Sequence, residues 1–196
     1  MSEKLDRRKK YTRKVLKESL IELLAEKPMS EITVKKVCEV ADINRSTFYT
    51  HYSDHYELLG KMEEEITEDM NTYLNSYSYA IEEESIQMTQ KILEYITENK
   101  FMFQTLLKKD GAPTFEKRMM DVTHRFLVEN WKSNNNDSEA NVTYLSTFVI
   151  SGAIHVIKDW IKDDMDQSPK EMAVLINNFI NYGLSYLDGN ERPRTK

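Results

Sequence analysis

The chain has 196 residues, 40% of them hydrophobic and 31% charged, with a formal net charge of −6. This length can bury a sizeable core, in one large domain or two small ones. The single cysteine, Cys38, excludes a disulfide within the chain, and no apolar run approaches membrane-spanning length, so we expect a cytoplasmic protein.

The charge is unevenly distributed. Residues 1–17 contain eight basic and two acidic residues, a net charge of +6. Residues 62–196 contain 14 basic and 23 acidic residues, a net charge of −9. A basic segment on an acidic body suggests that only the N-terminal part meets phosphate groups, although a solvated charged segment would have the same composition.

The sequence predicts an all-α fold. Glycine and proline number only five and four, too few for the turns that sheets need, and apolar residues recur at helical intervals. We predict helices at residues 6–26, 34–40, 45–52, 54–79, 82–98, 100–109, 114–132, 138–165 and 169–187.

Four of these helices have recognisable starting residues. Thr33, Asn44 and Ser53 each precede a predicted helix and have side chains that can accept a hydrogen bond from its first turn. The last helix begins with a capping box, Ser168 with Glu171, and has a proline at its first position.

The two short helices at 34–40 and 45–52 follow a longer one and are joined by a tight turn. Such a unit has the proportions of a helix-turn-helix, in which one short helix fits the major groove of DNA and the other braces it. Apolar residues on the inner sides would fix the crossing angle, and polar residues would face outward.

Residues 32–59 read ITVKKVCEVADINRSTFYTHYSDHYELL. This segment resembles the DNA-binding signature of the TetR family of bacterial regulators, which has Thr-Val at the start, Ala-Gly-Val at the turn, a Thr-Phe-Tyr-x-His-Phe block and an acidic-Leu-Leu sequence. The resemblance implies an N-terminal three-helix DNA-binding domain, residues 1–54, and a helical ligand-binding and dimerisation domain, residues 55–196.

The resemblance also implies the DNA contacts, which we predict for Thr33, Arg45, Ser46, Thr47, Tyr49, His51 and His55. Residues 45–47 would open the recognition helix and face base edges, with Arg45 suited to a guanine. Thr33, Tyr49 and His51 would contact phosphates. Phe48 and Tyr52 would pack inward, and Cys38 would be the family's small buried residue. Basic residues 7–14 would form a flexible arm on the DNA backbone or in the minor groove.

Three residues depart from the family pattern. Asp42 replaces the turn glycine, and aspartate tolerates a left-handed backbone better than most residues. His55 stands where many members have lysine, so its phosphate contact could be weak or pH-sensitive. Tyr52 replaces phenylalanine. These changes leave open an alternative, a dimeric regulatory protein that acts through a protein partner and binds DNA weakly or not at all.

The sequence does not predict an enzyme, a cofactor or a metal site. It has no glycine-rich phosphate loop, no metal cluster and no evident nucleophile–base pair. His51 and His55 are four residues apart, a metal-ligand spacing on one helix, but the helix boundary expected at Ser53 separates them.

The last two predicted helices, 138–165 and 169–187, are apolar on more than one side. A helix of this kind needs two packing partners, of which one would be a second copy of the chain. The segment from Phe148 to Ala173 resembles a C-terminal subgroup of the family that includes dihydroxyacetone-kinase operon regulators. The family resemblance thus implies a homodimeric repressor of a palindromic operator, responsive to a small-molecule effector, with ligand-binding residues left unassigned.

Several aromatic and methionine residues of this part could line an apolar cavity, although their helical spacing makes most of them ordinary core. They are Phe101, Phe103, Phe115, Phe126, Trp131, Phe148, Met88, Met102, Met119 and Met120.

Overall fold

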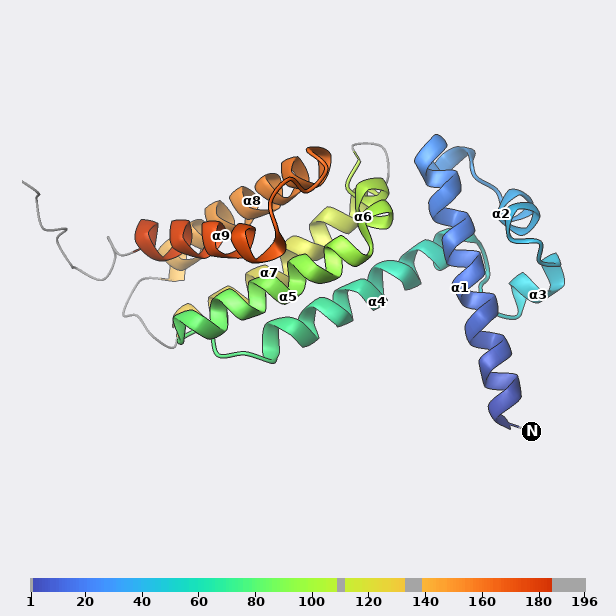
Figure 1. Cartoon of the computed structure of the whole chain (residues 1–196). Coiled ribbons are helices and arrows are strands. Elements are labelled where there is room, and N and C mark those ends of the chain that lie inside the picture. The colour runs from blue at the N-terminus through green and yellow to red at the C-terminus, as the bar shows by residue number, and fades with distance from the viewer. Residues whose placement is uncertain (1, 109–111, 133–138, 185–196) are drawn as a thin grey trace, which may run out of the picture. The chain divides into compact units, whose positions relative to one another are not determined.

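A computed structural model describes residues 2–108, 112–132 and 139–184, and within them the fold is all-α, as predicted (Figure 1). The described helices are α1 (Ser2–Glu26), the 3-10 helix η1 (Met29–Glu31), α2 (Val34–Ala41), α3 (Arg45–Tyr49), α4 (His55–Asn75), α5 (Glu82–Glu98), α6 (Lys100–Leu106), α7 (Pro113–Lys132), α8 (Glu139–Lys162) and α9 (Pro169–Leu184). Of the helices described, none is both long and apolar enough to cross a membrane.

The chain divides into two compact units. Unit 1 comprises Met1–Asp69 and Phe101–Met119, and unit 2 comprises Met70–Lys100 and Met120–Lys196. Unit 1 therefore combines α1 to α3 with most of α4, with α6 and with the first turns of α7. The division into DNA-binding and ligand-binding parts at residue 54 concerns function and stays a prediction.

Helix α1 is the spine of unit 1. Leu16, Leu20, Leu23 and Leu24 are all buried, and this face packs on α2. The helix begins at Ser2, so the prediction of a flexible arm at residues 7–14 was wrong. Lysine and arginine are good helix formers, and adding turns to a helix already anchored by its core residues avoids the cost of nucleation.

Most predicted helix starts are confirmed. Thr33 accepts a hydrogen bond from the Lys36 amide at 3.3 Å, and Asn44 accepts one from the Ser46 amide at 2.9 Å. At α9, the Glu171 carboxylate accepts a hydrogen bond from the Ser168 amide at 2.9 Å, and the Glu171 amide donates to the Ser168 hydroxyl at 3.3 Å, as a capping box requires.

Other helix boundaries differ from the predicted ones by a few residues. The carboxylate of Asp54, not Ser53, caps α4 by accepting from the Glu57 amide at 2.8 Å. Helix α3 ends at Tyr49, because the Thr50 amide donates to the carbonyl of Thr47, only three residues back in the chain, at 3.2 Å. The predicted end of the last helix, at residue 187, lies outside the described residues.

Unit 1 also buries a carboxylate. Glu63 of α4 is only 1% exposed. It accepts hydrogen bonds at 2.8 and 3.1 Å from the hydroxyl of Thr114, in the first turn of α7, and pairs at 3.0 Å with Nε of Arg118. These contacts join α4 to α7, and they compensate for part of the cost of removing a charge from water.

The buried position makes Glu63 a source of pH-dependent stability. Burial raises its pKa above the ordinary value of 4.5, against the hydrogen bond of Thr114 and the charge of Arg118. The folded chain thus holds this proton more tightly than the unfolded chain, so the Glu63 contribution to the free energy of unfolding falls as pH rises above about 4.5.

As pH rises above about 4.5, we expect the free energy of unfolding of the wild type to fall relative to that of Glu63→Gln. Glu63→Ala should lower the unfolding free energy at pH 7 by about 1–3 kcal/mol, because Thr114 and Arg118 lose their acceptor. Urea unfolding at several pH values measures both. Glu22→Gln, at an exposed position of α1, is the control, and a pH-independent difference for Glu63→Gln would contradict the assignment.

In unit 2, α5 packs along α9. Across this contact, the Asn177 side-chain amide donates a hydrogen bond at 2.9 Å to the hydroxyl of Thr89. Helix α8 buries one face through Val142, Val149, Ile150, Trp160 and Ile161. The turn after α8 is held by the Trp160 indole, which donates to the Gln167 carbonyl at 3.0 Å, and by an ion pair between Lys100 and Asp164.

Candidate DNA-binding site

The first helix of the helix-turn-helix, α2, follows an exposed threonine. Thr33 has an extended backbone, φ −131° and ψ 153°, and its hydroxyl oxygen accepts the Lys36 amide. The hydroxyl hydrogen remains able to donate to an oxygen outside the protein. Lys35 and Lys36 are exposed on the first turn, and both are near Glu39, at 3.8 and 3.5 Å.

The turn between α2 and α3 depends on Asp42, which has φ 51° and ψ 42°. This left-handed conformation is the one expected where the family has glycine, and aspartate is among the few other residues that adopt it readily. The next amide, of Ile43, donates back to the Cys38 carbonyl at 3.0 Å and closes the end of α2. Cys38 itself is buried, as predicted.

Helix α3 has one buried side and one exposed side. Phe48 is fully buried and Tyr52, just beyond the helix, is 5% exposed, with their ring centroids 5.8 Å apart. Both pack inward as predicted. Arg45 and Ser46 are exposed, and Thr47 is half-buried. The hydroxyl of Ser46 donates to the side-chain oxygen of Asn44 at 2.9 Å, so both polar groups stand at the N-terminal end of α3.

The remaining predicted contact residues follow along the same surface. Tyr49 is 57% exposed, while His51 and His55 are half-buried. His55 is the first residue of α4, and its Nδ1 is buried with no hydrogen-bond partner among the described residues. Only the other ring nitrogen can therefore face a phosphate. The described residues include no group of three or more candidate ligands that could hold a metal ion.

Basic residues of α1 affect the electrostatics of this surface. Burial and then the charges of Arg13 and Lys9 lower the pKa of His51. The sequence prediction missed this proximity, although a signal was present. Lys9 and Arg13 are seven and three residues before Leu16, a helical spacing that places them on the same side of α1 as Leu16 and Leu20.

The residues considered for an apolar cavity separate by burial. Phe103, Phe115, Phe126, Met88 and Met119 are buried, whereas Phe101 and Phe148 are exposed. Trp131 has a side chain outside the described set. Unit 2 contains an apolar groove of about 340 Å³ between α8 and α9, lined in part by Phe148, Val156, Leu175 and Phe179.

Solved structures of known proteins share this fold. A TetR transcriptional regulator from Streptococcus agalactiae 2603V is 22% identical with a TM-score of 0.67, covering 92% of this chain and 99% of that one. The dihydroxyacetone kinase operon activator DhaS is 18% identical with a TM-score of 0.61, covering 89% and 97%. NalD, the secondary repressor of the MexAB-OprM multidrug efflux pump in Pseudomonas aeruginosa, is 14% identical with a TM-score of 0.62, covering 89% and 96%.

Sequence comparison agrees. An uncharacterised HTH-type transcriptional regulator of Bacillus subtilis (strain 168), YxbF, is 25% identical over 167 residues, which are 81% of this chain. The match covers 42% of YxbF, so the chain spans less than half the length of this relative.

Residues 83–182, just over half of the chain, match the TetR-type family described as "Transcriptional regulator C-terminal region". The family consists of regulators rather than enzymes, in agreement with the sequence prediction. Together with the helix-turn-helix of residues 33–52 and the shared fold, this match shows that the chain belongs to the TetR family of helix-turn-helix transcriptional regulators.

Proposed function

We propose that this regulator binds a palindromic operator as a homodimer, represses transcription from it, and is released by a small-molecule effector in the cytoplasm. The observation that carries the DNA-binding part is the division of α3 into one buried and one exposed side. Phe48 fixes the helix from within, and Arg45 and Tyr49 stay outside. An exposed, polar, firmly anchored short helix is what the major groove admits.

The predicted contacts have distinct tasks. Arg45, at the first position of α3, can donate two hydrogen bonds to a guanine edge, and Ser46 and Thr47 can bond to neighbouring bases. Thr33 and Tyr49 have hydroxyls suited to phosphate oxygens, which would fix the depth and orientation of α3. His51 and His55 would contact phosphates at the far end of the motif.

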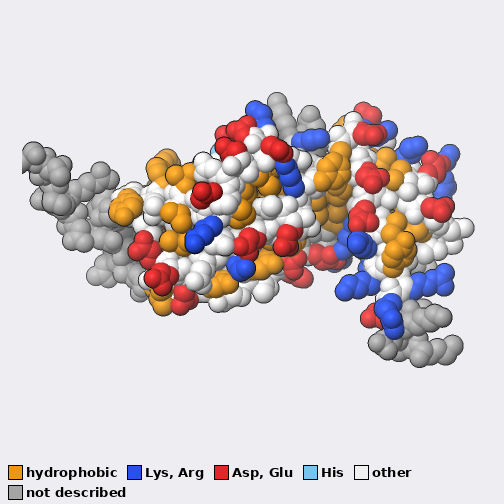
Figure 2. Space-filling view, in the orientation of Figure 1, with side chains coloured by type: hydrophobic (Ala, Val, Ile, Leu, Met, Phe, Trp, Pro, Cys, Tyr) orange, Lys and Arg blue, Asp and Glu red, His pale blue; other side chains and the backbone are white. Residues whose placement is uncertain are grey.

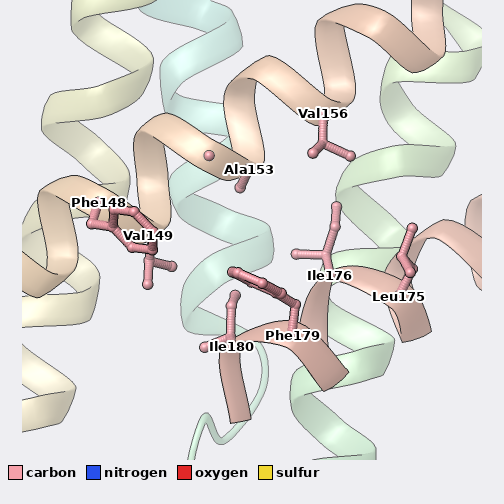
Figure 3. A pocket seen from close by; sticks show the side chains of 9 residues that line it. Phe148, Val149, Ala153, Val156, Leu175, Ile176, Phe179 and Ile180 are labelled. Atoms are coloured by element: carbon pink, nitrogen blue, oxygen red, sulfur yellow. The ribbon is translucent and has the colours of Figure 1, made fainter. Parts of the chain in front are cut away.

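The dimer is supported by an exposed apolar surface on α8 and α9, which we call the dimer face. Its exposed residues are Tyr144, Phe148, Val156, Leu175, Phe179 and Tyr182. Figure 3 shows side chains of α8 and α9 projecting toward the groove between the two helices. Contiguous apolar patches are rare on monomers. A second copy brings the same patch, so a two-fold axis would cover both at once.

Control by an effector would act through the geometry of the dimer. Helix α4 begins three residues after Tyr52, at the end of the motif, and runs to Asn75, beyond the limit of unit 1. A ligand that favours one tilt of α4 would alter the spacing of the two recognition helices and weaken operator binding. Both signs of regulation occur in the names of similar structures, since DhaS is an activator and NalD a repressor.

The first experiment is a selection of bound duplexes from a random pool, with the full chain at moderate salt. We expect a palindromic sequence to be enriched. Arg45→Ala should weaken binding to that sequence by about 1–3 kcal/mol and relax the preference at one position in each half-site.

Arg125→Ala is the matched control, since it removes the same charge from an exposed position of α7 in unit 2. If the folded protein enriches no sequence, or if both variants weaken binding equally, the reading of bases by α3 is wrong. A transcription assay on the selected operator then distinguishes repression from activation.

A further inference from the structure

Glu63 differs from the carboxylates that follow it on α4. Its neighbours Glu64, Glu65, Glu68 and Asp69 are exposed or half-buried, and Figure 2 shows acidic side chains on the surface around this helix. Glu63 itself is 1% exposed. A carboxylate in such a place has lost its hydration, so hydrogen bonds and a counter-charge of the protein must replace the water.

Two side chains of α7 replace this hydration. The Thr114 hydroxyl donates to the two carboxylate oxygens of Glu63 at 2.8 and 3.1 Å, and Nε of Arg118 pairs with one of them at 3.0 Å. Thr114 and Arg118 are four residues apart and lie on the same face of α7. All three contacts therefore form together only when α4 is at one position along α7. We call Glu63, Thr114 and Arg118 the Glu63 cluster.

The apolar residues of α4 do not specify this position. They recur at every fourth position, so a slide of α4 by four residues places one apolar side chain where another was. They are Leu58, Met62, Ile66, Met70 and Leu74, and each of them is buried. Two of the five are methionines, whose flexible side chains adapt to irregular surroundings. Packing of the apolar residues alone therefore admits more than one register.

Glu63 does distinguish between these registers. A slide of α4 by four residues brings Leu59 or Thr67 to the place of Glu63, and neither residue has a carboxylate. Glu63 would then be displaced from Arg118. A buried charge that has lost its partner is strongly unfavourable, whereas an intact buried pair contributes little more than apolar residues of the same volume. The cluster thus penalises the wrong register more than it stabilises the right one.

We propose that the Glu63 cluster is a register lock, which holds α4 at one position along α7. Slides of one packed helix past another by one turn are a known form of conformational change, and a single buried polar group can exclude them. Helix α4 begins three residues after Tyr52, so the lock also holds the end of the helix-turn-helix at one position relative to the first turns of α7. This inference goes beyond the proposed function, because it involves no contact with DNA.

The first measurement is urea unfolding of Glu63→Met, of Arg118→Met and of the triple variant Glu63→Met/Thr114→Val/Arg118→Met. Each single substitution leaves a partner unpaired, so its urea midpoint should lie below that of the wild type. The triple variant replaces the whole cluster with apolar groups of similar size, so its midpoint should equal or exceed that of the wild type. A triple variant that has a lower midpoint than the wild type, or does not fold, would overturn the proposal, since the cluster would then be needed for stability.

The second measurement is the distance between spin labels at Glu68→Cys on α4 and Lys117→Cys on α7, both exposed positions of unit 1, in a Cys38→Ala background. Labelled chains are diluted with unlabelled ones, so that electron paramagnetic resonance reports distances within one chain. We expect one distance with the native cluster. The triple variant should add a second population, from a slide of about 6 Å, which is four residues at about 1.5 Å each. One unchanged distance in the triple variant would show that the apolar residues set the register.

Two further variants serve as controls. Glu63→Gln keeps an acceptor for Thr114 and Arg118, so it should keep the single distance. Lys61→Gln/Glu64→Gln removes an ion pair of the same helix whose side chains are 52% and 45% exposed, and it should also keep the single distance. Two distances in this second control would mean that losing any charge pair of α4 has this effect, and the lock would be wrong. Neither measurement uses DNA, so failure of the lock and failure of operator binding are separate results.

Discussion

Replacing Phe48 with alanine is expected to lower the free energy of unfolding by about 3–5 kcal/mol, the usual cost of deleting a buried aromatic ring. Phe48 is 0% exposed, and its ring centroid lies 5.6 and 5.8 Å from those of Tyr49 and Tyr52. Helix α3 has only five residues, too few to be stable alone, so this anchor is what holds it. Operator binding should be lost together with stability.

The neighbouring aromatic residue provides the control. Tyr49 is 57% exposed, so Tyr49→Ala should change the unfolding free energy by about 0.5 kcal/mol or less while weakening DNA binding. Urea unfolding followed by circular dichroism, alongside binding to the selected duplex, separates the two effects. Equal destabilisation by both substitutions would show that α3 is not oriented as described.

The second large effect is expected at the dimer face. Phe179 is 65% exposed on α9, so Phe179→Asp removes an apolar anchor and places a charge in the proposed interface. An interface anchor contributes about 2 kcal/mol or more, and a two-fold dimer loses it twice. The dissociation constant of the dimer should therefore rise about 1000-fold. Sedimentation should then show a monomer at micromolar concentration, with operator affinity strongly reduced.

Asn181→Asp adds the same charge two residues away on α9, at an exposed position on a different side of the helix. It should leave the dimer intact. Phe148→Asp, on α8 at 68% exposed, should act like Phe179→Asp. A dimer that survives both phenylalanine substitutions unchanged would place the interface elsewhere, and thermal unfolding of each variant would show whether the protomer itself has lost its fold.

Local features of the sequence predicted much of this structure. The order of helices, the caps at Thr33 and Asn44 and the capping box at Ser168 all depend on residues within one turn of each other, so chain spacing is enough to identify them. The left-handed Asp42 and the inward Phe48 followed from the family motif. The DNA contacts assigned to the seven site residues stay predictions, because their partner is not part of this chain.

The tertiary structure alone decided the features that depend on distant segments. Glu63 looked like any exposed helix carboxylate, and only the packing of α4 on α7 buries it against Thr114 and Arg118. The effect of Arg13 and Lys9 on the pKa of His51 depends on how α1 packs against the helix-turn-helix, which the sequence does not show. On α8, whose sequence is apolar on several sides, burial of Val149 and exposure of Phe148 were settled by packing within unit 2. Helical periodicity shows which residues share a face, but only the contacts of the folded chain determine which face meets the core.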